Sequence, residues 1–425
     1  MCIRDSQKFG GSSVADAASI KRVARRIAAT KQAGNDIVVV ISAMGDTTDD
    51  LMDLALEVSP QPAPRELDML LTTGERQSAA LLAMALSDVG IPARSYTGSQ
   101  AGVITTAAHG NARIIDITPG RIEKSLEAGD LVIVAGFQGV SQTTKDVTTL
   151  GRGASDTTAV ALASSLGADF CEIYSDVDGV FTADPRIVKG ARRIPEISYE
   201  EMLEMAACGA KILHLRCVEY ARREDVPVHV RSSFSDKPGT WVKDPTDITK
   251  GSDMEEAIIS GVAHDRSEAK ITIAGLPDAV GRAAQIFEII AHADINIDMI
   301  VQNASRVMNG RTDLSFTLPM NDGPTAVRAL TAVKDELGYE QILYNDQIGK
   351  VSVVGVGMRT HPGVTSTFFR ALADCGINLQ MISTSEIRIS VVVDADQVDE
   401  AVRVAHTAFG LDAEGEAVVY AGTGR

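Results

Sequence analysis

Strands and amphipathic helices alternate along the first half of the chain. Ile37–Ile41 and Leu131–Ala135 are uninterrupted apolar runs, the pattern of strands covered on both faces in a parallel sheet. Val14–Ala33 instead repeats its apolar residues at the helical period of 3.6, and its basic residues form a solvated face. This alternation continues to about residue 230 and predicts the α/β class, a parallel sheet with helices on both faces. A ligand is then expected at the carboxyl edge of the strands.

Two longer segments are predicted to be helices. Arg65–Asp88 has helical periodicity, but Thr72–Gly74 is expected to interrupt it. Glu200–Val218 is predicted to be one helix that carries Lys211 and His214. We interpret this single histidine as a packing residue rather than a catalyst.

Changes in composition mark both borders of the first domain. Val226–Arg231 is predicted to be its closing strand, and the stretch Asp236–Met254, rich in Pro, Gly, Asp and Lys, its boundary. The first residues should form a buried strand, yet Arg4 and Asp5 are charged. We therefore hypothesise that Met1–Ser6 is a non-native start.

The stretch Thr148–Arg186 concentrates groups suited to phosphate. Leu150–Ala154 is a glycine-rich loop before a helix, and helix N-termini carry free N–H groups and partial positive charge. Arg152 adds a planar guanidinium to this loop. A second polar loop, Ser175–Arg186, follows the strand Phe170–Tyr174. A glycine-rich turn alone is equally typical of an ordinary strand-to-helix junction, but the charged residues in both loops favour a binding site.

The last third of the chain contains an internal repeat. Lys270–Gly275 parallels Lys350–Gly355, and Gly281 parallels Gly363, at a spacing of about 80 residues. Each unit is predicted to fold as strand, helix, strand, strand, helix. Because one such unit is too small to bury its sheet alone, we expect the two units to pair.

Composition excludes several classes of partner. The 425 residues carry a net charge of −17, which argues against nucleic acid or an anionic membrane as partner. The five cysteines form no CxxC pair, so we expect free thiols in a reducing cytoplasm and neither zinc nor disulfides. No apolar run approaches the roughly 18 residues that a membrane span requires.

Five motifs in this order resemble the signature blocks of the aspartate kinases (aspartokinases). They are KFGGSS at Lys8–Ser13, SAMGDTTD at Ser42–Asp49, LLTTGER at Leu70–Arg76, LGRGASDTTA at Leu150–Ala159 and YSDVDGVFTADPR at Tyr174–Arg186. The chain looks closest to the short bacterial type regulated by lysine and threonine. The resemblance implies a three-layer αβα amino-acid-kinase domain at 1–245 and two ferredoxin-like ACT modules at 265–346 and 347–425.

The resemblance also implies a reaction. ATP and L-aspartate would give ADP and 4-phospho-L-aspartate, the first step of lysine, threonine and methionine biosynthesis. The attacking carboxylate is already ionised near neutral pH, so no catalytic His or Ser is required. Magnesium would be held mainly by phosphates and water, and no protein ligand is assigned to it.

The resemblance implies roles for the residues that match the family's motifs. The catalytic groups would be Lys8, Arg152 and Asp156. Aspartate would be bound by Ser42, Thr48, Glu75, Arg152, Gly153 and Asp156. ATP would be bound by Lys8, Phe9, Gly10, Gly11, Tyr174, Ser175, Asp176, Phe181, Thr182, Asp184, Arg186 and Lys211.

Regulation is expected at the repeat. Lysine and threonine would bind at interfaces between ACT modules through Asp278, Asn296, Gln302, Asn378, Ser385 and Glu386. The first repeat has Asp278-Ala-Val-Gly281 where the family commonly has Asp-x-Pro-Gly. The resemblance further suggests an oligomer, with a shorter subunit that starts internally near Met254.

Two alternatives stay open at this point. The chain could be an amino-acid sensor whose kinase domain is inactive, because its first strand is charged and Ala154 replaces a family glycine; a positive φ at Ala154 would cost about 1 kcal/mol. It could also be another kinase of the same fold, acting on N-acetylglutamate, glutamate or carbamate, although the ACT repeat weighs against this. The kinase interpretation requires Lys8 and Arg152 to converge on one crevice.

Overall fold

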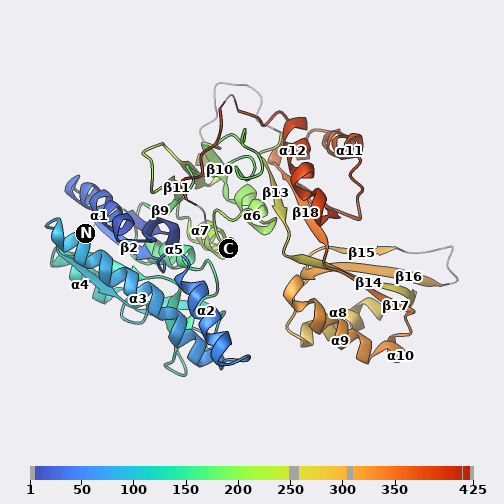
Figure 1. Cartoon of the computed structure of the whole chain (residues 1–425), viewed down its shortest axis with the longest axis horizontal. Helices are drawn as coiled ribbons and strands as arrows, with labels where there is room; N and C mark the ends of the chain where they lie inside the picture. The colour runs from blue at the N-terminus through green and yellow to red at the C-terminus, as the bar shows by residue number, and fades with distance from the viewer. Residues whose placement is uncertain (1–4, 248–257, 304–309, 414, 422–425) are drawn as a thin grey trace.

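The first half of the chain builds one sheet of eight strands (Figure 1). The structure, a computed structural model, describes residues 5–247, 258–303, 310–413 and 415–421. From one edge to the other the strands are β10 (Glu196–Ser198), β12 (Thr240–Lys243), β11 (Val228–Ser232), β9 (Phe170–Ser175), β1 (Asp5–Phe9), β2 (Ile37–Ile41), β6 (Leu131–Ala135) and β3 (Ala93–Tyr96). Neighbouring strands are parallel except for β11 with β12.

Helices cover both faces of this sheet, as β2 shows. Val38 and Val40 pack toward a layer of helices that comprises α4 (Gly120–Glu127), α5 (Ser155–Ser165), α6 (Tyr199–Ala207) and α7 (Leu215–Glu224). The alternate residues Ile37, Val39 and Ile41 pack toward α1 (Ala17–Gln32) and α3 (Pro64–Asp88). A strand apolar at every position is therefore buried on both sides. The predicted three-layer αβα domain is confirmed.

Smaller elements complete the first domain. A second sheet has the order β5 (Ile114–Ile117), β4 (Val103–Thr105), β7 (Gln138–Ser141) and β8 (Val147–Thr149). Helix α2 (Thr47–Val58) follows the loop after β2 and packs against α3.

Two modules follow the first domain, as the repeat predicts. The first has the sheet β15 (Ile300–Asn303), β16 (Arg311–Pro319), β14 (Glu268–Pro277) and β17 (Gln341–Asn345), with helices α8 (Arg282–His292), α9 (Gly323–Ala332) and α10 (Lys334–Leu337). The second has the sheet β13 (Gly261–Asp265), β18 (Ile348–Val354), β20 (Arg388–Asp394) and β19 (Met381–Thr384), with helices α11 (Val364–Asp374) and α12 (Val398–Ala408). Gly281 and Gly363 precede α8 and α11 with φ of 92° and 111°, a left-handed conformation that favours glycine.

The second module also recruits residues from outside the repeat. Its edge strand β13 precedes the whole first module in the chain and pairs antiparallel with β18. A buried lysine then joins the two modules, because Lys350 of β18 contacts both Glu268 and Asp298 of the first. The pairing expected from the small size of each unit is therefore present within one chain.

The structure corrects three expected elements. Helix α3 is continuous, because the hydroxyls of Thr72 and Thr73 donate to carbonyls three residues earlier and Gly74 lies against Ala43. Glycine and threonine here serve helix packing, and do not end the helix.

The predicted helix Glu200–Val218 is two helices, α6 and α7, so Lys211 lies in the loop between them. Gly209 ends the first with φ of 101°, and a Cβ there would lie 2.1 Å from the His264 carbonyl oxygen. Strand β11 does not close the domain either, because β12 continues the sheet inside the predicted boundary Asp236–Met254.

The charged first strand does form, at the centre of the sheet. Asp5 is 3% exposed and lies beside Glu172 of β9, and the Gln7 side-chain amide donates to both carboxyl groups. Burial, and then the negative charge of Glu172, raise the pKa of Asp5 to about 8. Arg4 and the rest of residues 1–4 lie outside the described residues, and the hypothesis about Met1–Ser6 stays a prediction.

Asp5→Asn is expected to stabilise the protein increasingly as pH rises from 5 to 8. A raised pKa in the folded state means that folding favours the protonated carboxyl, so the parent loses about 1.4 kcal/mol per pH unit in this window. Thermal unfolding of both proteins at pH 5 and pH 8 measures the effect. The exposed Asp88→Asn is the control, and a stability gap that stays the same at both pH values would contradict the assignment.

Candidate active site

Four parallel strands end side by side, and their loops are bonded to one another. The Ser42 N–H donates to the Phe9 carbonyl at 3.1 Å, and the Gly10 N–H to the Tyr174 carbonyl at 3.3 Å. The Gly136 N–H donates to the Ile41 carbonyl at 3.0 Å. The ends of β1, β2, β6 and β9 thus form one edge, as expected for a ligand site in a parallel sheet.

Gly11 allows the first two loops to touch. A Cβ at this position would lie 2.9 Å from the Gly45 carbonyl oxygen and 3.0 Å from that of Ala43. The Gly45 N–H in turn donates to the Gly11 carbonyl at 3.1 Å. Any larger residue at Gly11 would push the Lys8–Gly11 loop away from the Ser42 loop.

Lys8 and Asp156 form a largely buried ion pair at this edge. The Lys8 Nζ lies 2.6 Å from Asp156 Oδ1, with side chains 14% and 8% exposed. Asp156 stands in the first turn of α5, and its Oδ2 also accepts the His214 N–H at 3.4 Å. The ammonium group is therefore held beside a helix N-terminus, where backbone N–H groups and the cation together favour an anion.

The glycine-rich loop before α5 tolerates Ala154. This residue has φ of −78° and is buried, so no positive φ is required and its methyl group costs no backbone strain. The left-handed backbone conformation occurs instead at Gly151 and Gly153, which have φ of 92° and 74°. His214 packs against Gly153, as its interpretation as a packing residue expects.

Arg152 lies on the outer rim of the same edge. Its Nη2 lies 2.6 Å from Asp49 Oδ1, and its side chain is 69% exposed. Asp49 follows Thr48 in the first turn of α2, while Asp156, the partner of Lys8, lies one turn after Arg152. Arg152 and the Lys8–Asp156 pair thus both lie near the N-terminus of α5, and their convergence on one crevice stays a prediction.

Glu75 lies inside this edge because α3 is continuous. Its side chain is buried, and Oε1 accepts the Ala43 N–H at 3.3 Å. Oε2 has no hydrogen-bond partner among the described residues. Burial raises the pKa of Glu75 to about 7. Oε2 is itself buried, so this carboxyl group keeps an acceptor, unused by the described residues, inside the edge beside the Ser42 loop.

A cavity of about 370 Å³ lies behind the loop after β9. Six of the residues predicted to bind ATP line it: Ser175, Asp176, Phe181, Asp184, Arg186 and Lys211. Arg186 bonds to Asp176 at 3.2 Å, so cation and carboxylate fix one another at the mouth. The cavity thus joins the Ser175–Arg186 loop to the loop between α6 and α7.

Other residues predicted to bind ATP point elsewhere. The rings of Phe9 and Tyr174 stack at 4.6 Å within the core beneath α1, because side chains alternate along a strand and Ser175 takes the opposite face. Thr182 is buried and bonds to His406 of α12. Lys8 near the end of β1, and Gly10 and Gly11 just after this strand, lie outside the cavity lining. Phe9 and Tyr174 can therefore contribute backbone atoms but not rings.

The second module supplies a wall of the cavity that sequence reasoning missed. Val262, Ala263 and His264 of β13 line it beside the Ser175–Arg186 loop, and the Val262 N–H donates to the Thr182 carbonyl at 2.7 Å. These residues lie just after the predicted boundary and carry no motif. No local signal in the sequence distinguishes them from linker residues.

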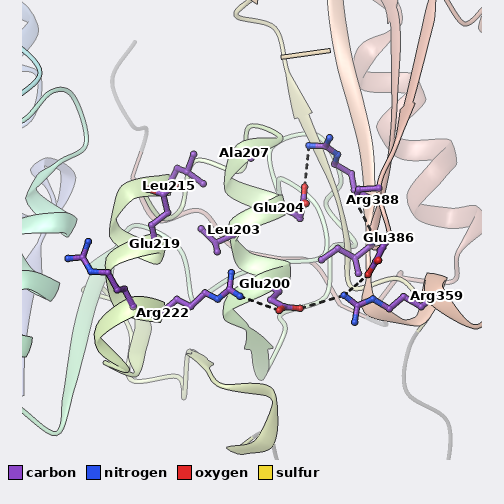
Figure 2. A pocket seen from close by; sticks show the side chains of 13 residues that line it. Glu200, Leu203, Glu204, Ala207, Leu215, Glu219, Arg222, Arg359, Glu386 and Arg388 are labelled. Atoms are coloured by element: carbon purple, nitrogen blue, oxygen red, sulfur yellow. Dashed lines mark hydrogen bonds and ion pairs between the residues drawn. The ribbon is translucent and has the colours of Figure 1, made fainter. Parts of the chain in front are cut away.

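Figure 2 shows a larger hollow, of about 870 Å³, between the first domain and the second module. Glu200 of α6 lies between Arg222 at 3.5 Å and Arg359 at 3.8 Å. Arg388 of β20 pairs with Glu204 at 3.2 Å. Two of the predicted effector residues, Ser385 and Glu386, line this hollow, and the other four are exposed: Asp278, Asn296, Gln302 and Asn378.

The described ranges contain neither a metal site nor a membrane-spanning helix. No group of three or more His, Cys, Asp or Glu side chains there is placed to hold a metal ion. Within the same ranges, no helix combines the length and the apolar character needed to cross a membrane.

Comparison with known proteins accounts for the whole chain. The profile of the Amino acid kinase family matches residues 7–232, and the ACT domain profile matches residues 271–333 and 351–409. An aspartokinase of Mycolicibacterium smegmatis is 65% identical over 419 residues, 99% of each chain. A crystal structure of E. coli aspartokinase III with aspartate and ADP, in the R-state, superposes with a TM-score of 0.81 at 26% identity, covering 95% of this chain and 99% of that one. The structure of the same enzyme with lysine and aspartate, in the T-state, gives 0.69 at 25% identity, covering 96% and 99%.

The family matches and the structural superpositions agree with the geometry of the sheet edge and with the paired modules. They also set aside the N-acetylglutamate, glutamate and carbamate kinases as the nearest relatives. The chain belongs to the aspartokinases, within the amino acid kinase family.

Proposed function

We propose that the chain transfers the terminal phosphoryl group of ATP to the side-chain carboxylate of L-aspartate at the edge where Lys8 meets α5. The observation that carries this is the Lys8–Asp156 pair of 2.6 Å at a helix N-terminus. The relative solved with aspartate and ADP supports the same two ligands here. We infer that the reaction starts lysine, threonine and methionine biosynthesis in the cytoplasm.

We expect L-aspartate to bind between Arg152 at the outer rim and the buried carboxyl group of Glu75. Arg152 is exposed enough to exchange Asp49 for a substrate carboxylate, which a guanidinium can bind through two parallel hydrogen bonds. Glu75 offers its free Oε2 to the substrate ammonium group. Ser42, Thr48 and Gly153, which match the family's motifs, are proposed to complete the aspartate site. The reacting carboxylate then points toward Lys8.

ATP fits with its base in the 370 Å³ cavity and its phosphates toward the loop after β1. Lys211 and Arg186 line this cavity and supply positive charge. Mg²⁺ would accompany the phosphates and be held mainly by them and by water, the coordination that this ion prefers. The metal would neutralise phosphate charge, and the residues of the chain orient the two substrates.

The chemical step requires correct placement of the two substrates and neutralisation of the phosphate charge. The carboxylate of aspartate is ionised near neutral pH and attacks without a general base. The transferring group passes through a loose transition state whose charge spreads over its oxygens. Lys8 would exchange its contact with Asp156 for a phosphate oxygen, and Asp156 holds the ammonium group in place until then.

Lys8→Met is expected to lower kcat by about a hundredfold or more, the typical loss when a preorganised cation of the transition state is removed. The KM for aspartate should change little, because Arg152 and Glu75 remain. ADP release coupled to aspartate addition measures both constants.

Lys21→Ala, which removes an exposed lysine from α1, is the matched control and should behave as the parent. Unchanged turnover in Lys8→Met would refute the role of Lys8. A parent protein that binds lysine or threonine but releases no ADP would favour the inactive sensor.

The KM for aspartate is expected to rise about tenfold from pH 8 to pH 6. Glu75 has a pKa of about 7, so it loses its charge over this range and with it the attraction for the substrate ammonium group. Initial rates at both pH values test this. Glu75→Gln should have a high KM that no longer depends on pH, and a parent KM that is flat across this range would contradict the role.

We infer that lysine and threonine inhibit the enzyme at interfaces between ACT modules. The six polar residues predicted for these sites are exposed in the single chain, as residues that meet a second chain would be. The relative solved with lysine and aspartate supports lysine as an effector. An oligomer is therefore part of the proposal. A shorter subunit starting near Met254 is a further prediction, and that position lies outside the described residues.

Millimolar lysine plus threonine is expected to lower the aspartate-dependent rate by about fivefold or more, the usual size of allosteric coupling. Gln302→Ala should weaken this inhibition and leave the uninhibited rate intact. Asn321→Ala, an exposed change elsewhere in the first module, is the control. Full activity of the parent at saturating lysine and threonine would remove the hypothesis.

A further inference from the structure

The chain runs back to the first domain after the last helix of the second module (Figure 1). We call Phe409–Ala421, without residue 414, the C-terminal strap. Its Ala413 and Ala417 N–H groups donate to the carbonyls of Gly190 and Lys189, each at 2.8 Å. The Tyr420 N–H donates to the Asp176 carbonyl at 2.9 Å. The strap is thus bonded along the loop that lines the proposed ATP cavity.

Tyr420 anchors the far end of the strap by its side chain. The ring stacks on Phe234 with centroids 5.8 Å apart and planes 6° from parallel. The hydroxyl donates to Asp178 Oδ2 at 3.3 Å. Asp178 also accepts from Lys237 at 2.7 Å, so Tyr420 completes a cluster directly after Asp176.

His406 of α12 holds the middle of the same loop. Its Nδ1 lies 3.1 Å from Asp412 Oδ1, and because that carboxylate only accepts, Nδ1 carries the proton. Nε2, 2.8 Å from Thr182 Oγ1, therefore accepts the threonine hydroxyl proton. The same hydroxyl oxygen accepts the Arg192 N–H at 2.9 Å. The imidazole is fully buried, so water cannot replace these bonds.

Apolar packing joins the loop to the second module as well. Ala183, Val188 and Ala191 are buried in one cluster with Phe368 of α11 and Val402 of α12. The loop between Asp176 and Ala191 is thus held from both sides. Val180 packs in the core of the first domain and its N–H donates to Thr240 Oγ1, whereas the later part of the loop packs in the ACT module. The strap adds backbone bonds at both ends of the loop, so the second module and the strap fix part of its conformation.

We propose that His406 and the C-terminal strap are positioning elements for ATP, which hold the loop from Asp176 to Thr182 in the conformation that receives the nucleotide. The proposal rests on the ATP site given under Proposed function. It predicts that the second module contributes to ATP affinity in the absence of any amino-acid effector. Neither His406 nor Tyr420 lines the cavity, so both act through the loop residues that do.

Point variants of the full chain separate this role from general stability. Tyr420→Ala removes the stack and the hydroxyl bond, and is expected to raise the KM for ATP about five- to tenfold while the KM for aspartate stays within twofold. Val418→Ser, at an exposed strap residue, is the control. A general loss of folding would instead lower kcat without raising one KM selectively.

A second pair of variants tests His406. An asparagine side chain can reach the position of Nδ1, and a glutamine side chain that of Nε2. His406→Asn should therefore raise the KM for ATP several-fold, and His406→Gln should return it toward the parent value because the Thr182 bond is restored. Melting temperatures are measured alongside. Matched ATP KM values for Tyr420→Ala, His406→Asn and the parent would overturn the proposal.

One further variant distinguishes a failure of this inference from a failure of the ATP-site assignment. Lys211→Ala removes a residue that lines the ATP cavity itself. If it raises the KM for ATP while the strap and His406 variants do not, the inference is wrong and the ATP site stands. If Lys211→Ala also leaves that KM unchanged, the assignment of the ATP site has failed, and the inference falls with it.

Discussion

The buried contact between Lys8 and Asp156 is the interaction on which the site depends. It joins the end of the central strand β1 to the first turn of α5, and so ties the sheet edge to a helix N-terminus. Removing either partner would leave the other as an uncompensated charge in a largely dry place, which is far costlier than losing an exposed pair. The pair therefore keeps a cation at a fixed point before any phosphate arrives. Preorganisation of this kind is what transfer through a loose transition state requires.

The second ACT module packs directly against the first domain. Strand β13 forms the edge of the second module's sheet and, at the same time, a wall of the cavity assigned to ATP. Arg388 pairs with Glu204 on α6, and α6 leads into the loop that carries Lys211. A ligand that moves the second module would therefore change the cavity that β13 lines, and linkage requires that this ligand and one bound in the cavity change each other's binding free energy equally. The higher TM-score to the R-state relative than to its T-state places this conformation nearer to the one solved without lysine.

Sequence pattern predicted what depends on local burial. Ile37–Ile41 and Leu131–Ala135 have the bounds expected, because a five-residue run of mostly β-branched apolar residues is typical of a strand covered on both faces. The helix expected after the glycine-rich loop Leu150–Ala154 is α5, and the glycine repeat located Gly281 and Gly363. Residue roles in the site rest on motifs, and remain predictions.

What the sequence did not predict depends on contacts between distant segments. Gly74 looked like a helix break, and only its packing against Ala43 explains the continuous helix that buries Glu75. Gly209 breaks the other helix because the His264 carbonyl, more than fifty residues later, approaches it closely. The roles of β13 and of Tyr420 have the same origin. The pattern of a single sequence does not show which distant segments come into contact in the fold.

The most direct test is a crystal structure of the full chain with L-aspartate and a non-hydrolysable ATP analogue. We expect the terminal phosphate to lie within about 3 Å of Lys8 Nζ, in line with the side-chain carboxylate of the bound aspartate. A terminal phosphate beyond the reach of Lys8, or an aspartate bound away from Arg152 and Glu75, would contradict it.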